Sequence, residues 1–217
     1  MAKQNKITEA HIIDFYMDDV TNLGEKPDDV ELFAASHKFE AAQFYKHFED
    51  FKDLDRSIFK ILIDTSIATL AESGDFISFN KKDKLLSLFF TFFENLNLNR
   101  DFCVITIKSY GISLSTLSLF SELKESFIQF MDSLKLETLS INLEALESIQ
   151  KKSINEAAWV QLLLTIKFWM TDESEQCQKT DIFIEKSINT SLELLNTQSL
   201  NNIIDLGKFL YAEKFKS

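Results

Sequence analysis

The stretch VELFAASHKFEAAQFYKHFEDFKDL, residues 30–54, holds two short helical patterns and the start of a long one. Apolar residues recur three and four positions apart in its first part, which predicts a short helix over about 28–36. A break is expected near Ser36, and a second short helix follows over about 39–48. From about residue 51 the same apolar spacing continues for several turns. We therefore expect two short helices that lead directly into a long one.

Helical periodicity also runs through most of the chain on both sides of this stretch. A first helix is expected over 7–23, where Gly24 offers a stop, and the long helix should end at SGDF, residues 73–76. Residues 137–154 are spotted with Ser and Asn and are expected to break into a short helix or a loop. Further helices are expected over 82–97, 100–110, 115–136, 155–171, 178–196 and 199–214. The sequence predicts an all-α protein in which three short N-terminal helices precede a larger helical part.

Composition excludes several classes of protein. The 217 residues include four glycines and one proline, far below the roughly 7% and 5% of ordinary proteins. Antiparallel sheets and barrels need such residues for their tight turns, so an all-β fold is nearly excluded. Phosphate-cradling glycine loops are excluded as a class, because no two of the four glycines lie close together in the sequence. The net charge of −11 argues against general adhesion to nucleic acid, though not against a small basic face. No apolar run reaches membrane-spanning length and no secretory signal is present, so we expect a cytoplasmic protein without a membrane span.

Patterns that would support catalysis or metal binding are missing from the sequence. The histidines, His11, His37 and His47, form no ligand pair on one helix, and two cysteines are too few for a four-thiolate site. Cys103 lies in the apolar segment FCVITI, where a thiol is usually an inert core residue. We therefore expect no enzyme activity, no metal and no cofactor, although a buried acid pair cannot be recognised from sequence.

Phenylalanine is unusually frequent, with 21 residues. The segment LSLFFTFFENL, residues 86–96, places Phe on every side of a helix, and a helix that is apolar all round is buried on all sides. Two interpretations stay open: a central core helix, or aromatic side chains that line a cavity for a small apolar ligand. The candidates for such a ligand pocket are Phe89, Phe92, Phe93, Phe102, Tyr110, Phe120, Phe127 and Met131.

The block YKHF, residues 45–48, is followed six residues later by Leu54. These residues resemble the Tyr-x-His-Phe end of the recognition helix, and the Leu six residues later, in the tetracycline-repressor (TetR) family of bacterial transcriptional regulators. The segment FWMTDESEQCQKTDIFIEKSINTSLEL, residues 168–194, is similar to the C-terminal domain of a subgroup of the family. The resemblance implies a helix-turn-helix DNA-binding domain over 1–50 and a helical ligand-binding and dimerisation domain over 51–217.

The resemblance also implies which residues meet double-stranded DNA and which meet a second subunit. The DNA-binding candidates are Lys38, Gln43, Tyr45, Lys46 and His47. In a homodimer, the helices over 155–171 and 178–196 would pack as a four-helix bundle across a two-fold axis. The interface candidates are Trp159, Leu163, Ile184, Ile188, Leu192 and Leu195, a stripe that could also be core within one chain.

The N-terminal region departs from the family in its charge and in its turn. Residues 1–55 hold six Lys and no Arg against thirteen Asp and Glu, whereas phosphate neutralisation supplies most of a DNA-binding domain's affinity. Lys38 or a neighbour replaces the family's turn glycine. Two interpretations stay open: a ligand-responsive homodimeric regulator, or a protein of the same fold that binds an apolar ligand or lipid and has lost DNA binding. An enzyme is a third, weakly supported interpretation.

Overall fold

The computed structural model describes residues 7–111, 114–136 and 144–195. Every regular element within these ranges is a helix, so the predicted all-α class is confirmed. The N-terminal elements are α1 (Glu9–Leu23), α2 (Val30–Ser36) and α3 (Ala41–Phe44). The elements that follow are α4 (Phe51–Glu72), η1 (Phe76–Ser78), α5 (Lys81–Leu98), α6 (Arg100–Tyr110), α7 (Leu114–Leu119), α8 (Ser121–Ser133), α9 (Glu144–Met170), η2 (Glu175–Cys177) and α10 (Gln178–Leu195).

The first two helices have well-formed ends. α1 begins at a capping box in which Thr8 and His11 each accept a hydrogen bond from the backbone N–H of the other. It ends at Gly24, whose φ of 75° lies in the left-handed region that glycine adopts without strain. Asp29 caps α2 by accepting from the backbone N–H of Leu32 at 2.8 Å. Local side-chain chemistry therefore sets both helix starts.

The third helix is shorter than predicted. We expected helix over 39–48, but α3 covers only Ala41–Phe44, and residues 45–47 form a turn. Glu40 stands at the N-cap and makes no side-chain hydrogen bond there, so no cap stabilises the start of this helix. A single turn without a cap has little stability of its own, and packing of the buried Phe44 holds it in place.

Three other helix boundaries also differ from the sequence prediction. The helix expected over 115–136 is interrupted at Phe120, which separates α7 from α8. α9 already begins at Glu144, inside the expected break over 137–154, because residues 144–151 consist mainly of strong helix formers such as Glu, Ala, Leu and Lys. The helix expected over 199–214 lies outside the described residues.

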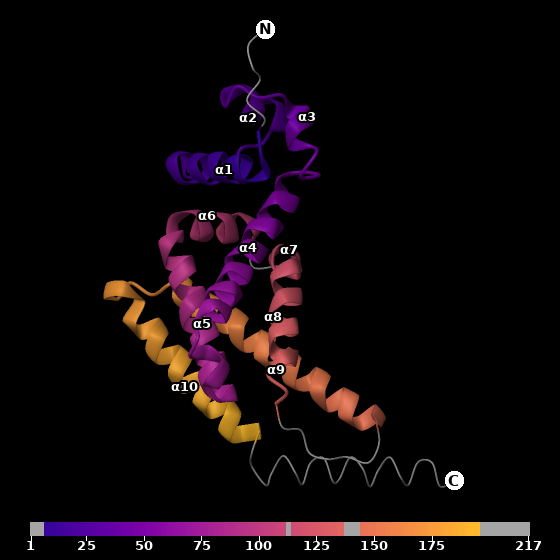
Figure 1. Ribbon diagram of the computed structural model, residues 1–217. Coiled ribbons are helices and arrows are strands. Elements are labelled where there is room, and N and C mark those ends of the chain that lie inside the picture. The colour runs from indigo at the N-terminus through magenta and orange to yellow at the C-terminus, as the bar shows by residue number, and fades with distance from the viewer. Residues whose placement is uncertain (1–6, 112–113, 137–143, 196–217) are drawn as a thin grey trace. The chain divides into compact units, whose positions relative to one another are not determined.

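The helices pack into two units. One unit holds residues 1–72 and 91–129, and the other holds 73–90 and 130–217. The predicted boundary near residue 50 marks the end of the three short helices and lies within the first of these units. In the first unit α1 packs against α6, α2 packs against α3, and α7 contacts α4 and α6 (Figure 1). In the second unit α9 and α10 lie side by side (Figure 1).

Aromatic side chains fill the core of the first unit. Tyr16 stacks on Phe51 with 5.2 Å between ring centroids, and Phe33 meets Phe51 edge-on at 5.6 Å. Phe59 meets Phe120 edge-on at 5.2 Å. Offset and edge-to-face ring pairs add to the stability that burial supplies. Many of the Phe residues are therefore used in packing, both among the N-terminal helices and around α4.

Candidate functional site

The segment between α2 and α3 has the geometry of a tight helix-turn-helix connection. Lys38 has a φ of 59°, the left-handed conformation that favours glycine. Its N–H donates to the carbonyl of Ala35 at 3.1 Å, and the next N–H, of Phe39, donates to Ala34 at 3.0 Å. Lys38 thus stands where a turn glycine is expected, in the conformation that a glycine would adopt.

The predicted DNA-binding residues gather around this turn and on the end of α3. Lys38, Tyr45, Lys46 and His47 are exposed, and Gln43 is half-buried. Phe44 and Phe48, which flank this set, are buried and anchor the segment. The alternation of buried Phe with exposed polar side chains presents a polar surface over residues 38–47.

Acidic neighbours engage part of this surface. The Tyr45 hydroxyl donates to Glu31 at 3.4 Å, and Nδ1 of His47 lies 3.7 Å from a carboxylate oxygen of Glu9. His37 lies 2.9 Å from Asp19 through Nε2. Each carboxylate offsets a positive or donating group that would otherwise face a phosphate. Lys38 and Lys46 are the exposed cations of residues 38–47.

A buried acidic group, Asp55 of α4, is the hydrogen-bonding centre of the first unit. Asp55 is fully buried and accepts from the Tyr16 hydroxyl of α1 at 2.8 Å and from the Tyr110 hydroxyl of α6 at 2.9 Å. The Lys26 ammonium, between α1 and α2, forms an ion pair with its second oxygen at 2.8 Å. Lys26 also lies over the Tyr110 ring, 4.4 Å from the centroid. One side chain of α4 thus fixes α1, its following loop and α6.

The electrostatics of this Asp55 cluster follow from its burial. Burial raises the pKa of Asp55, and the Lys26 ammonium and the two tyrosine hydrogen bonds only partly oppose this effect. Burial and the adjacent carboxylate also raise the pKa of Tyr16 and of Tyr110 well above the ordinary tyrosine value. Both tyrosines therefore stay protonated and act as donors. This cluster was not predicted. Its one indication in the sequence is that Asp55, beside Leu54, stands on an otherwise apolar helix face.

The predicted aromatic ligand-pocket residues are core residues. Phe92, Phe93, Phe102, Phe120 and Phe127 are buried in the first unit, where Tyr110 is bound to Asp55. Phe89 and Met131 are buried in the second unit. Phe102 also borders a surface hollow of about 620 Å³ beside α1, and the other predicted pocket residues line neither this hollow nor the two described below. The core interpretation of the Phe-rich helix is therefore the better one.

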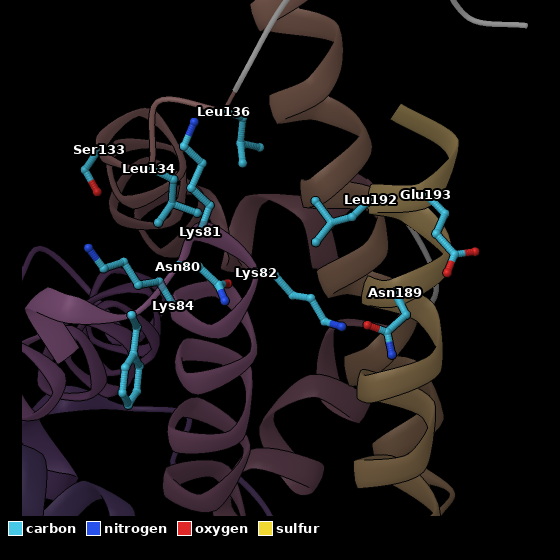
Figure 2. Close-up of a pocket in the computed structure, with 11 residues that line it drawn as sticks. Asn80, Lys81, Lys82, Lys84, Ser133, Leu134, Leu136, Asn189, Leu192 and Glu193 are labelled. Atoms are coloured by element: carbon cyan, nitrogen blue, oxygen red, sulfur yellow. The ribbon is translucent and has the colours of Figure 1, made fainter. Parts of the chain in front are cut away.

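A hollow in the second unit lies among α5, the end of α8 and α10. Its volume is about 900 Å³, and it is lined by Lys81, Lys82, Lys84, Leu134, Leu192 and Asn189, among others. In Figure 2, Lys82 of α5 and Asn189 of α10 point toward one another across this hollow. The predicted ligand site did not include these residues, whose one signal in the sequence is the run of positive charge KKDK, residues 81–84, at a helix start.

The α9–α10 pair presents an apolar outer face. Val160, Leu164 and Ile182 are each about half exposed, at 51%, 53% and 51%. They line a shallow hollow of about 690 Å³ together with Phe168 and Phe183, whose rings stack at 4.8 Å. This face carries few charged groups.

The predicted interface residues lie mostly elsewhere on the same two helices. Trp159, Ile184 and Ile188 are buried within the single chain, so these side chains are covered without a second subunit. Leu163 and Leu192 are half-buried, and the Leu195 side chain lies outside the described residues. The helical period was read correctly, but periodicity alone does not tell which of two apolar faces turns inward.

Two general properties of the described residues bear on function. No group of three or more His, Cys, Asp or Glu side chains in this part of the chain could hold a metal ion. None of its helices is long and apolar enough to cross a membrane.

Comparison with known proteins places these features in a family. The family model of the tetracyclin repressor-like C-terminal domain matches residues 84–210, more than half of the chain. The fold is similar to that of a Streptomyces coelicolor A3(2) protein, provisionally described as a transcriptional regulator in a structural genomics crystal structure. The TM-score is 0.51 at 11% identity, over 88% of this chain and 98% of that one, and at this identity the likeness concerns the fold alone. No curated protein matches the chain significantly.

Proposed function

Because the chain belongs to the tetracyclin repressor-like family of transcriptional regulators, we propose that it is a homodimer that binds double-stranded DNA through residues 38–47 and responds to a small ligand. Regulators of this family are generally not enzymes. The observation that carries the proposal is the α2–turn–α3 geometry, in which Lys38 takes the left-handed conformation of a turn glycine. Exposed Lys38, Tyr45 and Lys46 then supply phosphate contacts, and Gln43 is suited to read adenine.

The proposed dimer uses the outer face of α9 and α10. Val160, Leu164 and Ile182 leave apolar surface exposed on two neighbouring helices, and a second copy of the same pair would cover it as a four-helix bundle. To bind DNA as a homodimer, the protein needs its two α3 segments about 34–36 Å apart, one for each of two successive major grooves. A ligand that favours a different separation of the α3 segments would shift the population away from the DNA-binding state.

A second candidate function has its own supporting observation. The carboxylates of Glu31 and Glu9 engage Tyr45 and His47, and Lys26 is occupied by Asp55, so few positive groups are left for phosphates. A protein of this fold that binds an apolar ligand or lipid without binding DNA would show the same features. We favour the regulator because the turn geometry is retained.

Selection from random duplex DNA with the purified chain, at about 50 and 200 mM salt, tests the choice between them. The regulator should enrich a palindrome with half-sites one turn apart, and its affinity should fall as salt rises. Lys38→Gln and Lys46→Gln should each weaken binding on all sequences and reduce the salt slope by about 1. Lys60→Gln is the matched control, because Lys60 pairs with Asp64 on α4 outside this surface. No enrichment at the lower salt would favour the second candidate.

Light scattering tests the dimer separately. Leu164→Glu would place a charge at the centre of the apolar α9–α10 face and should convert the dimer to a monomer at micromolar concentration. Leu23→Glu is the matched control, since Leu23 is 66% exposed at the end of α1 and lies in the first unit. A wild-type monomer, or a dimer that Leu164→Glu leaves intact, would contradict the proposed interface.

A further inference from the structure

The first turn of α5 carries charges that are unfavourable for a helix start. Lys81, Lys82 and Lys84 all lie there, and Asp83 is the one acidic residue of that turn. A helix N-terminus is the positive end of the helix dipole, so cations placed there are repelled by the dipole and by one another. Asp83 is engaged with the N-cap residue Asn80, to which its backbone N–H donates at 2.9 Å. Residues that conflict with the helix dipole in this way are found most often at functional positions.

These lysines border the hollow of about 900 Å³, whose size falls within the roughly 300–1,000 Å³ of small-molecule sites. Among the residues that line it, Glu193 is the one carboxylate against the three lysines. The lining is thus net positive in a chain of net charge −11. Such a local excess of positive charge favours an anion.

The rest of the lining is suited to an apolar chain. Leu134 is 6% exposed and lies on the α8 side of the hollow, Leu136 lies near it, and Leu192 adds aliphatic surface from α10 (Figure 2). Charged and apolar linings therefore meet in one hollow. A molecule with an anionic head and an aliphatic tail matches both.

Asn189 supplies a polar group for the head. Its Oδ1 atom is buried and has no hydrogen-bond partner within the described residues, and its side chain points toward Lys82 (Figure 2). A buried polar atom without a partner costs stability, and a bound molecule can supply the partner. Rotation of the amide exchanges its oxygen for its NH₂ group, so Asn189 can donate to an anionic oxygen as well as accept from a hydroxyl.

We propose that this hollow binds an amphiphile with an anionic head group and an aliphatic chain, and that Lys82 and Asn189 hold the head. Carboxylates and phosphate monoesters share this chemistry. The inference rests on the proposed function in one respect, since it names the class of ligand to which the regulator would respond. The binding step itself requires neither DNA nor a dimer.

Calorimetry on the full-length chain without DNA tests the proposal. Decanoate and decyl phosphate should bind at one site per chain, and the tighter of the two identifies the head group. Decanol should bind at least about tenfold more weakly, because a lost charge-assisted contact of about 1.4 kcal/mol is a factor of ten. Inorganic phosphate should show no binding at the same concentration, because it lacks the chain.

Variants connect the binding to this hollow. Lys82→Gln should lose at least about tenfold in decanoate affinity, and Asn189→Leu should also weaken it. Lys152→Gln is the matched control, an exposed α9 lysine outside the lining, and should bind decanoate like the wild type. Lys82→Gln should melt at the same or a higher temperature than the wild type, because it removes a positive charge from a helix start that holds three lysines.

Four results would overturn the proposal. They are no saturable binding of either anionic probe, equal binding of decanol and decanoate, unchanged decanoate affinity in Lys82→Gln, and a lowered melting temperature of that variant. The DNA selection described above reports on the proposed function independently. A chain that selects a palindrome but binds no anionic amphiphile refutes this inference alone, and a chain that binds decanoate but no DNA refutes only the proposed DNA-binding function.

Discussion

Replacing Asp55 by alanine tests whether the Asp55 cluster holds the first unit together. The substitution removes the acceptor of two tyrosine hydroxyls and the partner of the Lys26 ammonium, which lie 2.8, 2.9 and 2.8 Å away. Removing one partner from a buried ion pair costs about 3–5 kcal/mol, because the other charge and the donors stay buried without partners. We therefore expect Asp55→Ala to lower the free energy of unfolding by about 3–5 kcal/mol.

The contribution of a single hydrogen bond can be separated by a double-mutant cycle. Tyr16→Phe removes one donor and should cost about 1–2 kcal/mol, because Asp55 keeps Lys26 and Tyr110. Combining it with Asp55→Ala should cost less than the sum of the two single substitutions, by about 1 kcal/mol or more.

Urea denaturation followed by circular dichroism measures these free energies. The matched control is Asp64→Ala, which removes an exposed carboxylate of the same helix that pairs with Lys60 and should cost about 0.5 kcal/mol or less. A loss below about 1 kcal/mol for Asp55→Ala, or strict additivity with Tyr16→Phe, would refute the view that this cluster is a coupled, stabilising unit.

Three further predictions concern backbone strain and pH. Lys38→Gly should raise the free energy of unfolding by up to about 1 kcal/mol in the same assay, because glycine adopts the left-handed turn without strain, and it should still weaken DNA binding. Asp172 accepts hydrogen bonds from Ser174 and Thr180, which, against the opposing effect of burial, hold its pKa well below the ordinary value, so it stabilises the fold above about pH 4 and that contribution should disappear on acidification. Asp172→Ala should be less stable at neutral pH and less sensitive to acid, as thermal melts between pH 2 and pH 7 would show. Because the pKa of Tyr16 is raised in the folded chain, stability should fall above about pH 10 by about 1.4 kcal/mol per pH unit for this group, and Tyr16→Phe should abolish its share of that slope.

The sequence predicted the all-α fold and the family because both depend on local patterns. The three-and-four spacing of apolar residues locates helices, and the YKHF block at residues 45–48 reports the end of a helix-turn-helix. Helix ends were harder to predict, since the early start of α9 depends on helix propensity that a scattering of Ser residues concealed. The differences in helix propensity that set such a boundary are small, so packing against the rest of the fold can move it by several residues.

The candidate sites were less predictable because they depend on contacts between distant segments. Asp55 meets Tyr110 across 55 positions of sequence, and no local pattern announces such a partner. Ile184 and Ile188 were assigned to the outer face of α10 because an apolar stripe is visible in sequence, whereas the direction in which it faces is not. The lysines of residues 81–84 did carry a local signal, which was their conflict with the helix dipole.

The connections of α1 have a consequence for protein engineering. Its buried face, which includes Ile12 and Tyr16, packs in a unit to which α6 also belongs, and the Tyr16 hydroxyl is bound to α4. A chimera that joins residues 1–50 to another sensor domain would expose this face to water and separate Tyr16 from its acceptor. The smallest graft that keeps α1, α2 and α3 folded must therefore carry α4 and α6 with it, and so needs junctions in more than one place along the chain.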